Sequence, residues 1–416
     1  MAKKIVLAYS GGLDTSVAIR WLQEERGYDV IALTIDLGNE KDLRTVEQRA
    51  MEIGAIKCVV RDGKQPFIDY FAFPALMAGA VYEGQYLLAT AIGRPLIAKM
   101  LVDVAREEGA QAIAHGCTGK GKDQVRFDVS TKALAPDLEI VAPVREHRMS
   151  RDEQIEWAAA RNVPVPATKA SPYSTDENLW GRSIEAGVLE DPWASPPEEI
   201  YEWSRSIADA PDAPRDVEIG FLHGRPVSLD EHEMDGVTLV QTLNQWAGEH
   251  GVGRTDMVEN RLIGIKSREI YEAPGAWTLH TAHEALEQLT LSKDQLRTKN
   301  SLRQAYADVI YNGLWFTAHH QDLAAYVQST QRYVSGTVRM RLHKGRAVAV
   351  GKKSPKSLYS YQLATYDRGD QYDHDNAVGF IQIWGLPVAQ QAQIQLLAEG
   401  EQPFQLGTSE NTNAGA

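Results

Sequence analysis

Residues 1–167 carry apolar runs that alternate with helical repeats. Apolar runs at 5–8, 29–38, 56–60, 110–116 and 139–144 predict strands that are buried on both faces. The apolar spacing over 42–54 and 94–108 predicts helices between them. This alternation predicts an α/β fold with a doubly wound parallel sheet. In such a sheet, ligands bind at the carboxyl ends of the strands, beside the point where the strand order reverses.

The pattern changes after this segment. Ser150 and Glu153 form a capping box for a helix that runs to about Arg161, and the prolines in 162–174 predict a linker. Alternating residues at 217–229 and 336–351 predict antiparallel strand pairs, and 281–312 is mostly helical in pattern. We therefore expect a doubly wound domain over 1–167, an α+β domain over 168–370, and a C-terminal helix or tail over 371–416 whose end is disordered.

Composition and charge narrow the class of protein. A chain of 416 residues with 43% hydrophobic residues is long enough for more than one core. Its formal net charge of −13 disfavours an extended nucleic-acid interface, which needs clustered cations. Two cysteines are too few for a disulfide framework, and the first apolar run is too short for a signal peptide or a membrane span. We therefore expect a cytoplasmic protein with no nucleic-acid and no membrane partner.

A glycine loop at residues 10–12 follows the first predicted strand and leads into a helix. Two glycines allow positive φ and leave successive N–H groups uncovered, and a helix N-terminus adds unpaired N–H groups and partial positive charge. The hydroxyls of Ser10, Thr15 and Ser16 lie in the same turn, together with Asp14. These features predict a site for a phosphate or pyrophosphate group, whereas two glycines alone would indicate an ordinary strand-to-helix turn.

A second glycine loop, HGCTGKGKDQVRFD, follows the fourth predicted strand. Gly116 and Lys122 belong to a match to G-x-x-x-x-G-K, but Asp123 stands where a P-loop has Ser or Thr for Mg²⁺. An acid at that position repels phosphate. A polar loop with Thr118, Asp123 and Arg126 suits a zwitterionic small molecule with ammonium and carboxylate groups, and a solvated charged loop is the alternative.

Five long motifs in a fixed order carry a resemblance to one family. They are AYSGGLDTS, HGCTGKGKDQVRFD, SPYSTDENLWGRSIEAGVLEDPW, GVGRTDMVENRLIGIKSREIYEAPGA and SLYSYQLATY. With these motifs the chain resembles argininosuccinate synthase from about Ile5 to Gly385. The SGG-x-D-[ST] pattern by itself marks only the wider group of ATP pyrophosphatases. The resemblance implies a nucleotide-binding domain of the adenine nucleotide alpha hydrolase type, a synthetase and multimerisation domain, and a C-terminal oligomerisation tail.

The resemblance implies an ATP-dependent ligase that joins citrulline to aspartate through a citrullyl-adenylate and releases AMP and pyrophosphate. Adenylation turns the ureido oxygen of citrulline into a leaving group, which the amine of aspartate displaces. Both steps need alignment and charge stabilisation more than a protein nucleophile. Mg²⁺ would accompany the nucleotide, with no metal site of the protein's own. The resemblance also implies a homotetramer in which the C-terminal segment, here with the mixed apolar stretch 379–397, reaches across subunits.

By motif, the resemblance assigns three sets of binding residues. ATP would be bound by Ala8, Tyr9, Ser10, Gly11, Gly12, Leu13, Asp14, Thr15, Ser16, Ile35 and Gly116. Aspartate would be bound by Thr118, Lys122 and Asp123, and citrulline by Tyr86, Thr90, Lys122, Arg126, Ser174, Ser183, Glu259 and Tyr271. Catalytic alignment and charge stabilisation would come from Ser10, Asp14, Thr15, Ser16, Asp123 and Arg126. Chemically, Arg126 suits a carboxylate and Glu259 suits an ammonium group.

Two positions depart from the family pattern. The family usually has Asn where this chain has Lys122, and an amide both donates and accepts hydrogen bonds whereas a lysine only donates. We therefore expect Lys122→Asn to raise catalytic efficiency with citrulline and aspartate. Ala91 stands where many members have Ser, and the neighbouring Thr90 is a candidate for the missing hydroxyl.

Two other functions remain open on the sequence. Another ATP pyrophosphatase, such as a tRNA-modifying enzyme, would be supported by a basic face or paired catalytic cysteines, and neither is visible in the sequence. A non-catalytic adenine-nucleotide sensor is the function that Lys122 favours most. Cys117 fits a small buried side chain better than a reactive thiol, and the histidines show no spacing that indicates a metal site.

Overall fold

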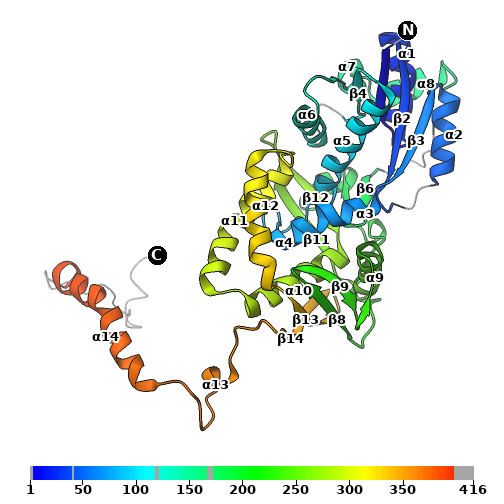
Figure 1. The fold of residues 1–416 in the computed structure, drawn as a ribbon. Coiled ribbons are helices and arrows are strands. Elements are labelled where there is room, and N and C mark those ends of the chain that lie inside the picture. The colour runs from blue at the N-terminus through cyan, green and yellow to red at the C-terminus, as the bar shows by residue number, and fades with distance from the viewer. Residues whose placement is uncertain (1–2, 40–41, 118–120, 166–171, 398–416) are drawn as a thin grey trace, which may run out of the picture. The chain divides into compact units, whose positions relative to one another are not determined.

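The computed structural model describes residues 3–39, 42–117, 121–165 and 172–397. The chain forms two units, Met1–Leu358 and Tyr359–Ala416 (Figure 1).

Five parallel strands form the sheet that the first part of the sequence predicts. They are β1 (Lys3–Ala8), β2 (Tyr28–Asp36), β3 (Lys57–Asp62), β4 (Ala112–Ala114) and β5 (Glu139–Val141). The strand order is β3-β2-β1-β4-β5, so β1 lies between β2 and β4. The order reverses at β1 and β4, the two strands that the glycine loops follow, and this confirms the predicted fold class of the first domain.

Helices cover both faces of this sheet (Figure 1). Successive side chains of a strand point to opposite faces, so Ile5 and Leu7 pack into one core while Val6 packs into the other. The first core is covered by α1 (Leu13–Arg26), α2 (Leu43–Ile53) and α8 (Arg151–Ala159), and the second by α5 (Ala89–Glu108) and α6 (Asp123–Leu134). The predicted capping box is present at the start of α8. The short helices of this part are α3 (Lys64–Phe67), α4 (Phe73–Ala78) and α7 (Pro143–His147).

Two antiparallel sheets follow in the same unit. One has the order β11-β12-β7-β6 and the other β10-β9-β8-β13-β14. Their strands are β6 (Ser174–Asn178), β7 (Gly181–Glu185), β8 (Arg215–Leu222), β9 (Arg225–Leu229), β10 (His232–Glu233), β11 (Arg254–Asn260), β12 (Lys266–Glu272), β13 (Gly336–His343) and β14 (Arg346–Lys353). The helices are α9 (Gly236–Glu249), α10 (Pro274–Thr290), α11 (Lys293–Tyr311) and α12 (Ala318–Thr330). They share a core that also takes in the first half of α5.

The predicted elements of this second part are confirmed. The 217–229 and 336–351 segments form the antiparallel pairs β8–β9 and β13–β14. The turn between β13 and β14 has Lys344 and Gly345 at positive φ, as a two-residue hairpin turn of matching twist requires. The helical stretch is two helices, because Ser292 caps α11 with its own capping box. The predicted linker falls partly on 166–171, which lie outside the described residues, and the domain boundaries stay predictions.

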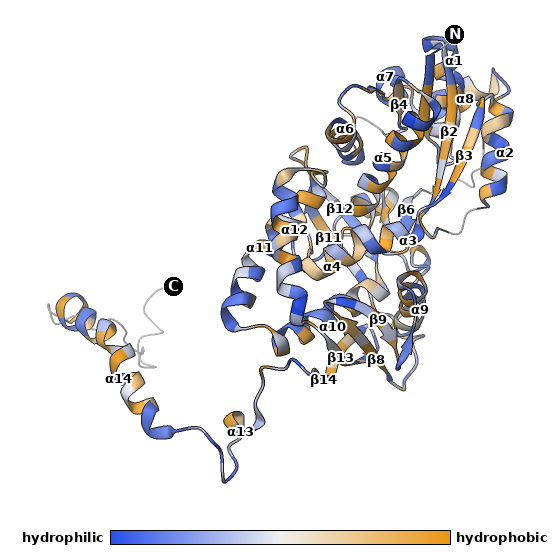
Figure 2. Cartoon of the chain, in the orientation of Figure 1, coloured by the Kyte–Doolittle hydropathy of each residue, from blue (hydrophilic) through white to orange (hydrophobic). Residues whose placement is uncertain are grey.

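The unit Tyr359–Ala416 contains α13 (Tyr361–Ala364) and α14 (His374–Gln391). Hydrophobic residues run along α14 (Figure 2), and its side chains of Phe380, Ile383 and Trp384 are 63%, 71% and 74% exposed. No helix among the described residues is long and apolar enough to cross a bilayer. The predicted disordered end, residues 398–416, lies outside the described residues.

Candidate active site

The first glycine loop joins β1 to α1 with an open helix end. Gly11 has φ +79°, where an L side chain is strained, and Gly12 starts α1 without any side-chain capping bond. The hydroxyl of Ser10 lies 3.2 Å from that of Thr15, and Arg49 Nη1 donates to the Gly11 carbonyl at 2.9 Å. Arg49 therefore holds the loop, while the N–H groups of the first helical turn have no side-chain cap among the described residues and remain suited to an anion.

Ser16 and Tyr9 support this loop from inside the protein. Ser16 is fully buried, and its hydroxyl lies 3.2 Å from the phenol of Tyr9. The Tyr9 carbonyl accepts a hydrogen bond from Thr34 at 3.0 Å. The hydroxyl that lies at the surface of the loop is that of Ser10, which is exposed, whereas Thr15 is buried and its hydroxyl donates to the Gly12 carbonyl at 3.4 Å.

The two glycine loops meet at the carboxyl ends of β1 and β4. A Cβ placed on Gly116 would lie 2.8 Å from the Thr15 methyl group, so only glycine fits there without displacement. Next to it, Cys117 donates its N–H to His115, whose other ring nitrogen pairs with Asp128 at 2.8 Å. Burial raises the pKa of the Cys117 thiol, which agrees with a structural rather than a reactive cysteine. Thr118, predicted to bind aspartate, lies outside the described residues.

Asp123 lies between two arginines. Arg94 of α5 and Arg126 of α6 each donate to its carboxylate at 2.8 Å, and Arg94 also pairs with Asp176 of β6. Burial opposes ionisation of Asp123, but the two guanidinium groups outweigh it and hold the pKa of this carboxyl well below its usual range. Asp123 is therefore an anion with firmly set geometry.

Arg126 is fully buried and still has bonding capacity. Its Nε donates to the Tyr311 carbonyl at 2.9 Å and its Nη1 to Asp123, and the guanidinium lies 4.8 Å from the centre of the Tyr311 ring. Its Nη2 has no hydrogen-bond partner among the described residues. A buried guanidinium nitrogen without a partner is costly, and a ligand carboxylate would satisfy it.

Glu259 of β11 is a fully buried carboxylate with three donors. It accepts hydrogen bonds from Lys122 Nζ at 2.6 Å, from the Tyr271 hydroxyl at 2.6 Å and from the Tyr311 hydroxyl at 2.7 Å. Burial opposes its ionisation, but Lys122 and the two phenols prevail and lower the pKa of Glu259. The result is a buried anionic centre suited to an ammonium group, with the chain's own Lys122 bound to it.

A second buried carboxylate, Glu269 of β12, also lies beside Lys122. It is 3.4 Å from Lys122 Nζ and accepts a hydrogen bond from Arg261 at 2.8 Å. Burial raises the pKa of Glu269 to about 7, with help from Glu185 and Glu259 and against the opposing effect of Lys122. Burial also works against the charge of Lys122, but Glu269 and Glu259 outweigh it and raise the pKa of the lysine.

The remaining predicted residues border this cluster to different degrees. Tyr86 stacks on Tyr271 with ring centres 4.2 Å apart, and its hydroxyl lies 2.7 Å from that of Thr90. Ser183 of β7 pairs with Tyr271 in the sheet. Ser174, at the start of β6, is exposed and pairs with Glu185.

Ile35, predicted to bind ATP, and Ala91, a departure from the family pattern, are placed by other contacts. Ile35 lies near the carboxyl end of β2, where a Cβ on Gly63 would meet its side chain. Ala91, where a hydroxyl was expected from the family pattern, is fully buried, and its N–H donates to the Tyr86 hydroxyl at 3.3 Å.

Sequence reasoning missed four residues of this site: Arg94, Asp176, Glu269 and Tyr311. Glu269 could have been predicted from the sequence, because it stands two residues before Tyr271 and therefore on the same face of a strand. Tyr311 comes from the end of α11, 52 residues from Glu259 along the chain, and no local pattern connects them. Arg94 is one of several charged residues of α5, with Lys99 and Asp103 among the others, and nothing in the local pattern distinguishes it from them.

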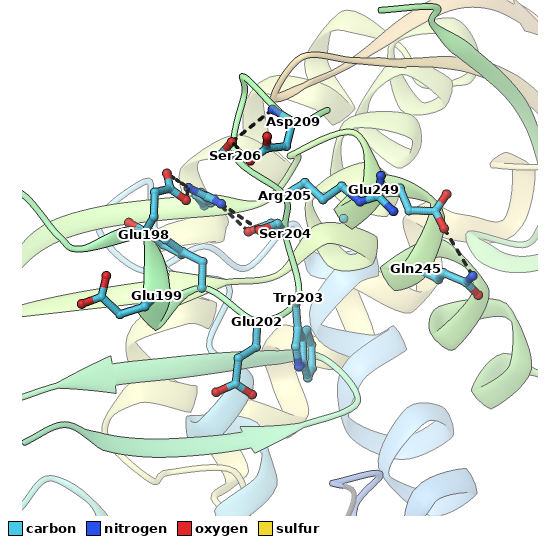
Figure 3. Close-up of a pocket in the computed structure, with 13 residues that line it drawn as sticks. Glu198, Glu199, Glu202, Trp203, Ser204, Arg205, Ser206, Asp209, Gln245 and Glu249 are labelled. Carbon is cyan, nitrogen blue, oxygen red and sulfur yellow. Dashed lines mark hydrogen bonds and ion pairs between the residues drawn. The ribbon is translucent and has the colours of Figure 1, made fainter. Parts of the chain in front are cut away.

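A separate cavity of about 610 Å³ lies in the same unit, between the 198–209 segment and the end of α9 (Figure 3). Its described lining includes none of the predicted site residues. Arg254 donates to Glu198 at 2.7 Å and to the Ser204 hydroxyl at 2.9 Å, so polar groups of the lining satisfy one another. Within the described ranges, no three His, Cys, Asp or Glu side chains are placed to hold a metal ion.

Comparison with known proteins gives a match along nearly the whole chain. Residues 4–164 match the family model described as the arginosuccinate synthase N-terminal HUP domain, and residues 173–391 match the arginosuccinate synthase C-terminal domain. The chain is 55% identical to the argininosuccinate synthase of Dehalococcoides mccartyi over 401 residues, which cover 96% of this chain and 99% of that protein. It is 55% identical to the enzyme of the same name from Brevibacillus brevis over 395 residues, 95% of this chain and 94% of that one. The corresponding protein of Bacillus velezensis is 54% identical over 385 residues, 92% of this chain and 95% of its own length.

Proposed function

The chain belongs to the argininosuccinate synthase family, and on that premise we propose how its residues serve the family's reaction. It is an ATP-dependent ligase that forms a carbon–nitrogen bond between citrulline and aspartate in arginine biosynthesis. The reaction passes through a citrullyl-adenylate and releases AMP and pyrophosphate.

ATP binds in our proposal to the first glycine loop, residues 8–16, with Gly116 and Ile35 completing the nucleotide site. The uncapped start of α1 supports this assignment, because a triphosphate supplies the acceptors that its N–H groups lack. Ser10 and Thr15 add hydroxyl donors at the same turn. Ser16 and Tyr9 act on the phosphates through the shape of the loop, since their hydroxyls bond to each other below it.

Citrulline binds beside Arg126 and Glu259, with Tyr86, Thr90, Ser174, Ser183 and Tyr271 around it. The observation that carries this assignment is the buried Arg126 Nη2, which has no partner among the described residues and belongs to a side chain that is 0% exposed. Tyr311 connects Arg126 to the acidic centre, because its carbonyl accepts from Arg126 and its hydroxyl donates to Glu259. A carboxylate on the arginine and an ammonium group on the glutamate satisfy both ends of an amino acid. Asp123, ionised between Arg94 and Arg126, and Thr118 are assigned to aspartate.

Both steps of the reaction require these residues to align the substrates and to stabilise developing charge. The first step forms a bond from the ureido oxygen to the α-phosphorus and breaks the bond to pyrophosphate, whose charge the loop N–H groups and hydroxyls stabilise. In the second step the amine of aspartate attacks the ureido carbon and AMP leaves. Rigid placement of the two amino acids by Arg126, Asp123 and Glu259 supplies the near-attack geometry.

Mg²⁺ is part of the proposal as a companion of the triphosphate. Asp14 is the acidic residue in the first turn of α1, at the end of the helix to which the triphosphate is assigned. The ion would neutralise charge on the departing pyrophosphate.

We also propose a cytoplasmic homotetramer. The exposed apolar side chains of α14 support it, since water-exposed Phe380, Ile383 and Trp384 are more stable when covered by another subunit. Sedimentation of the full chain and of a truncation before Gly379 tests this, and an unchanged assembly after truncation would contradict a role for α14.

Pyrophosphate release tests the function itself. We expect release that requires citrulline and aspartate together and yields AMP. ADP as the product, or release with neither amino acid, would refute the proposal, and ATP binding without turnover under any amino-acid pair would indicate a nucleotide sensor.

A further inference from the structure

Lys122 is bound by two buried carboxylates at once. Its Nζ lies 2.6 Å from Glu259 and 3.4 Å from Glu269, and its side chain is only 13% exposed. The rings of Tyr86 and Tyr311 lie 5.8 Å and 5.9 Å away. An ammonium group enclosed by carboxylates and aromatic faces is the arrangement by which proteins bind an amino-acid ammonium.

The chain's own cation therefore occupies the place that a substrate ammonium needs. Glu259 also accepts hydrogen bonds from the Tyr271 and Tyr311 hydroxyls. Two of these bonds reach Oε1 and one reaches Oε2, so Glu259 has room for one more donor. A substrate ammonium bound there would lie beside the ammonium of Lys122, and the repulsion between the two like charges favours a shift of Lys122 away from Glu259. Glu269 lies close enough to accept Lys122 after such a change.

We propose that Lys122 and Glu269 form a cation-exchange pair that sets the affinity for the ammonium-bearing ureido substrate. In the free enzyme Lys122 binds Glu259, and when citrulline binds, its α-ammonium takes Glu259 while Lys122 shifts to Glu269. This inference rests on the proposed assignment of citrulline to Glu259. Lys122 contacts the substrate's subsite directly, and Glu269 is a positioning residue that acts through Lys122.

The exchange carries a proton with it. Among the described residues, the charged and titratable groups that face Glu269 are Lys122 before α6, Glu185 on β7, Glu259 on β11, Arg261 after β11 and Tyr271 on β12. With its pKa raised to about 7, Glu269 is largely protonated below that pH and must lose its proton to the solvent before it can pair fully with Lys122. Citrulline binding thus releases a proton near neutral pH, and the affinity falls as the pH drops from 8 to 6.

Three variants test the exchange, with KM and kcat measured separately for each, because the exchange changes the KM for citrulline. Lys122→Asn should lower the KM for citrulline roughly tenfold, the weight of one charge-assisted hydrogen bond, and remove the rise of that KM at acid pH. Glu269→Gln should raise the KM for citrulline by about the same factor, because Lys122 then stays on Glu259. The double variant should show a citrulline KM no higher than that of the parent enzyme. The KM for ATP serves as the internal control and should change less than about twofold.

A purely structural role for Glu269 predicts no rescue by Lys122→Asn, and that result would overturn the proposal. An unchanged or higher citrulline KM in active Lys122→Asn would also overturn it. If the variants do not fold, titration calorimetry of the parent enzyme with citrulline in two buffers of different ionisation heat decides, because the proposal requires proton release and zero release refutes it. If the ligase assignment itself is wrong, the parent enzyme shows no pyrophosphate release that depends on citrulline and aspartate, and this outcome is distinct from the results above.

Discussion

Replacing Gly11 with alanine tests the conformation of the phosphate-binding loop. Gly11 has φ +79°, and an added Cβ would lie 3.0 Å and 3.2 Å from the two methyl groups of Val46, which is 7% exposed. The left-handed conformation costs an L residue about 1–2 kcal/mol, and the crowding against a buried valine adds about 1–3 kcal/mol.

The sum, about 2–5 kcal/mol, is the free energy by which Gly11→Ala disfavours the present loop. If the loop relaxes to another conformation when ATP is absent, nucleotide binding must restore it. Two kcal/mol corresponds to roughly a 30-fold loss of affinity. We therefore expect the KM for ATP to rise at least tenfold, with a smaller change in the KM for citrulline.

The assay is pyrophosphate release with ATP varied at saturating amino acids, alongside thermal unfolding. Gly27→Ala is the matched control, because Gly27 has φ +66° at the end of α1 and open space around its Cβ. It should lower stability by about 1 kcal/mol and leave the KM for ATP unchanged. Adding Val46→Ala to Gly11→Ala should restore the part of the ATP affinity that is lost to crowding and not the part lost to φ. An ATP KM that stays at the parent value in Gly11→Ala would refute the reasoning.

Three further predictions concern other parts of the molecule. Tyr271→Phe removes one of the three donors to buried Glu259 and should raise the KM for citrulline about tenfold in the same kinetic assay, whereas an unchanged value would remove the phenol from the site. Glu287→Gln leaves Lys299, 1% exposed and bonded to Glu287 at 2.9 Å, without its counter-ion, and should lower the free energy of unfolding in guanidinium by about 3–5 kcal/mol. A double change to Met at 299 and Leu at 287 should recover most of that loss, and no recovery would contradict the buried-charge explanation. Burial raises the pKa of Cys58 to about 11 from its ordinary 9.0, so iodoacetamide should modify this thiol roughly 100-fold more slowly at pH 8 in the native than in the unfolded protein, as peptide mass spectrometry measures; equal rates would contradict it.

Much of the fold follows from local pattern. The five parallel strands can be predicted because each is an apolar run between helical repeats. The strand β1 and the glycine loop after it lie in one short stretch of sequence, so both follow from local pattern. The hairpin at Lys344 and Gly345 is equally local, since the turn type depends on neighbouring φ values. The mixed apolar stretch 379–397 of the sequence contains the exposed apolar side chains of α14.

The chemistry of the binding residues follows from the sequence, and their partners follow from the tertiary structure. Sequence by itself determined which residue types could bind phosphate, carboxylate and ammonium groups, because those preferences belong to the side chains and to short spacings such as Ser10 to Ser16. Only the tertiary structure decided their partners. Lys122 and Glu259 are 137 residues apart, and Arg126 meets the carbonyl of Tyr311 across 185 residues. The energy of a buried ion pair depends on distance and on the exclusion of water, and both exist only after packing has brought separate elements together.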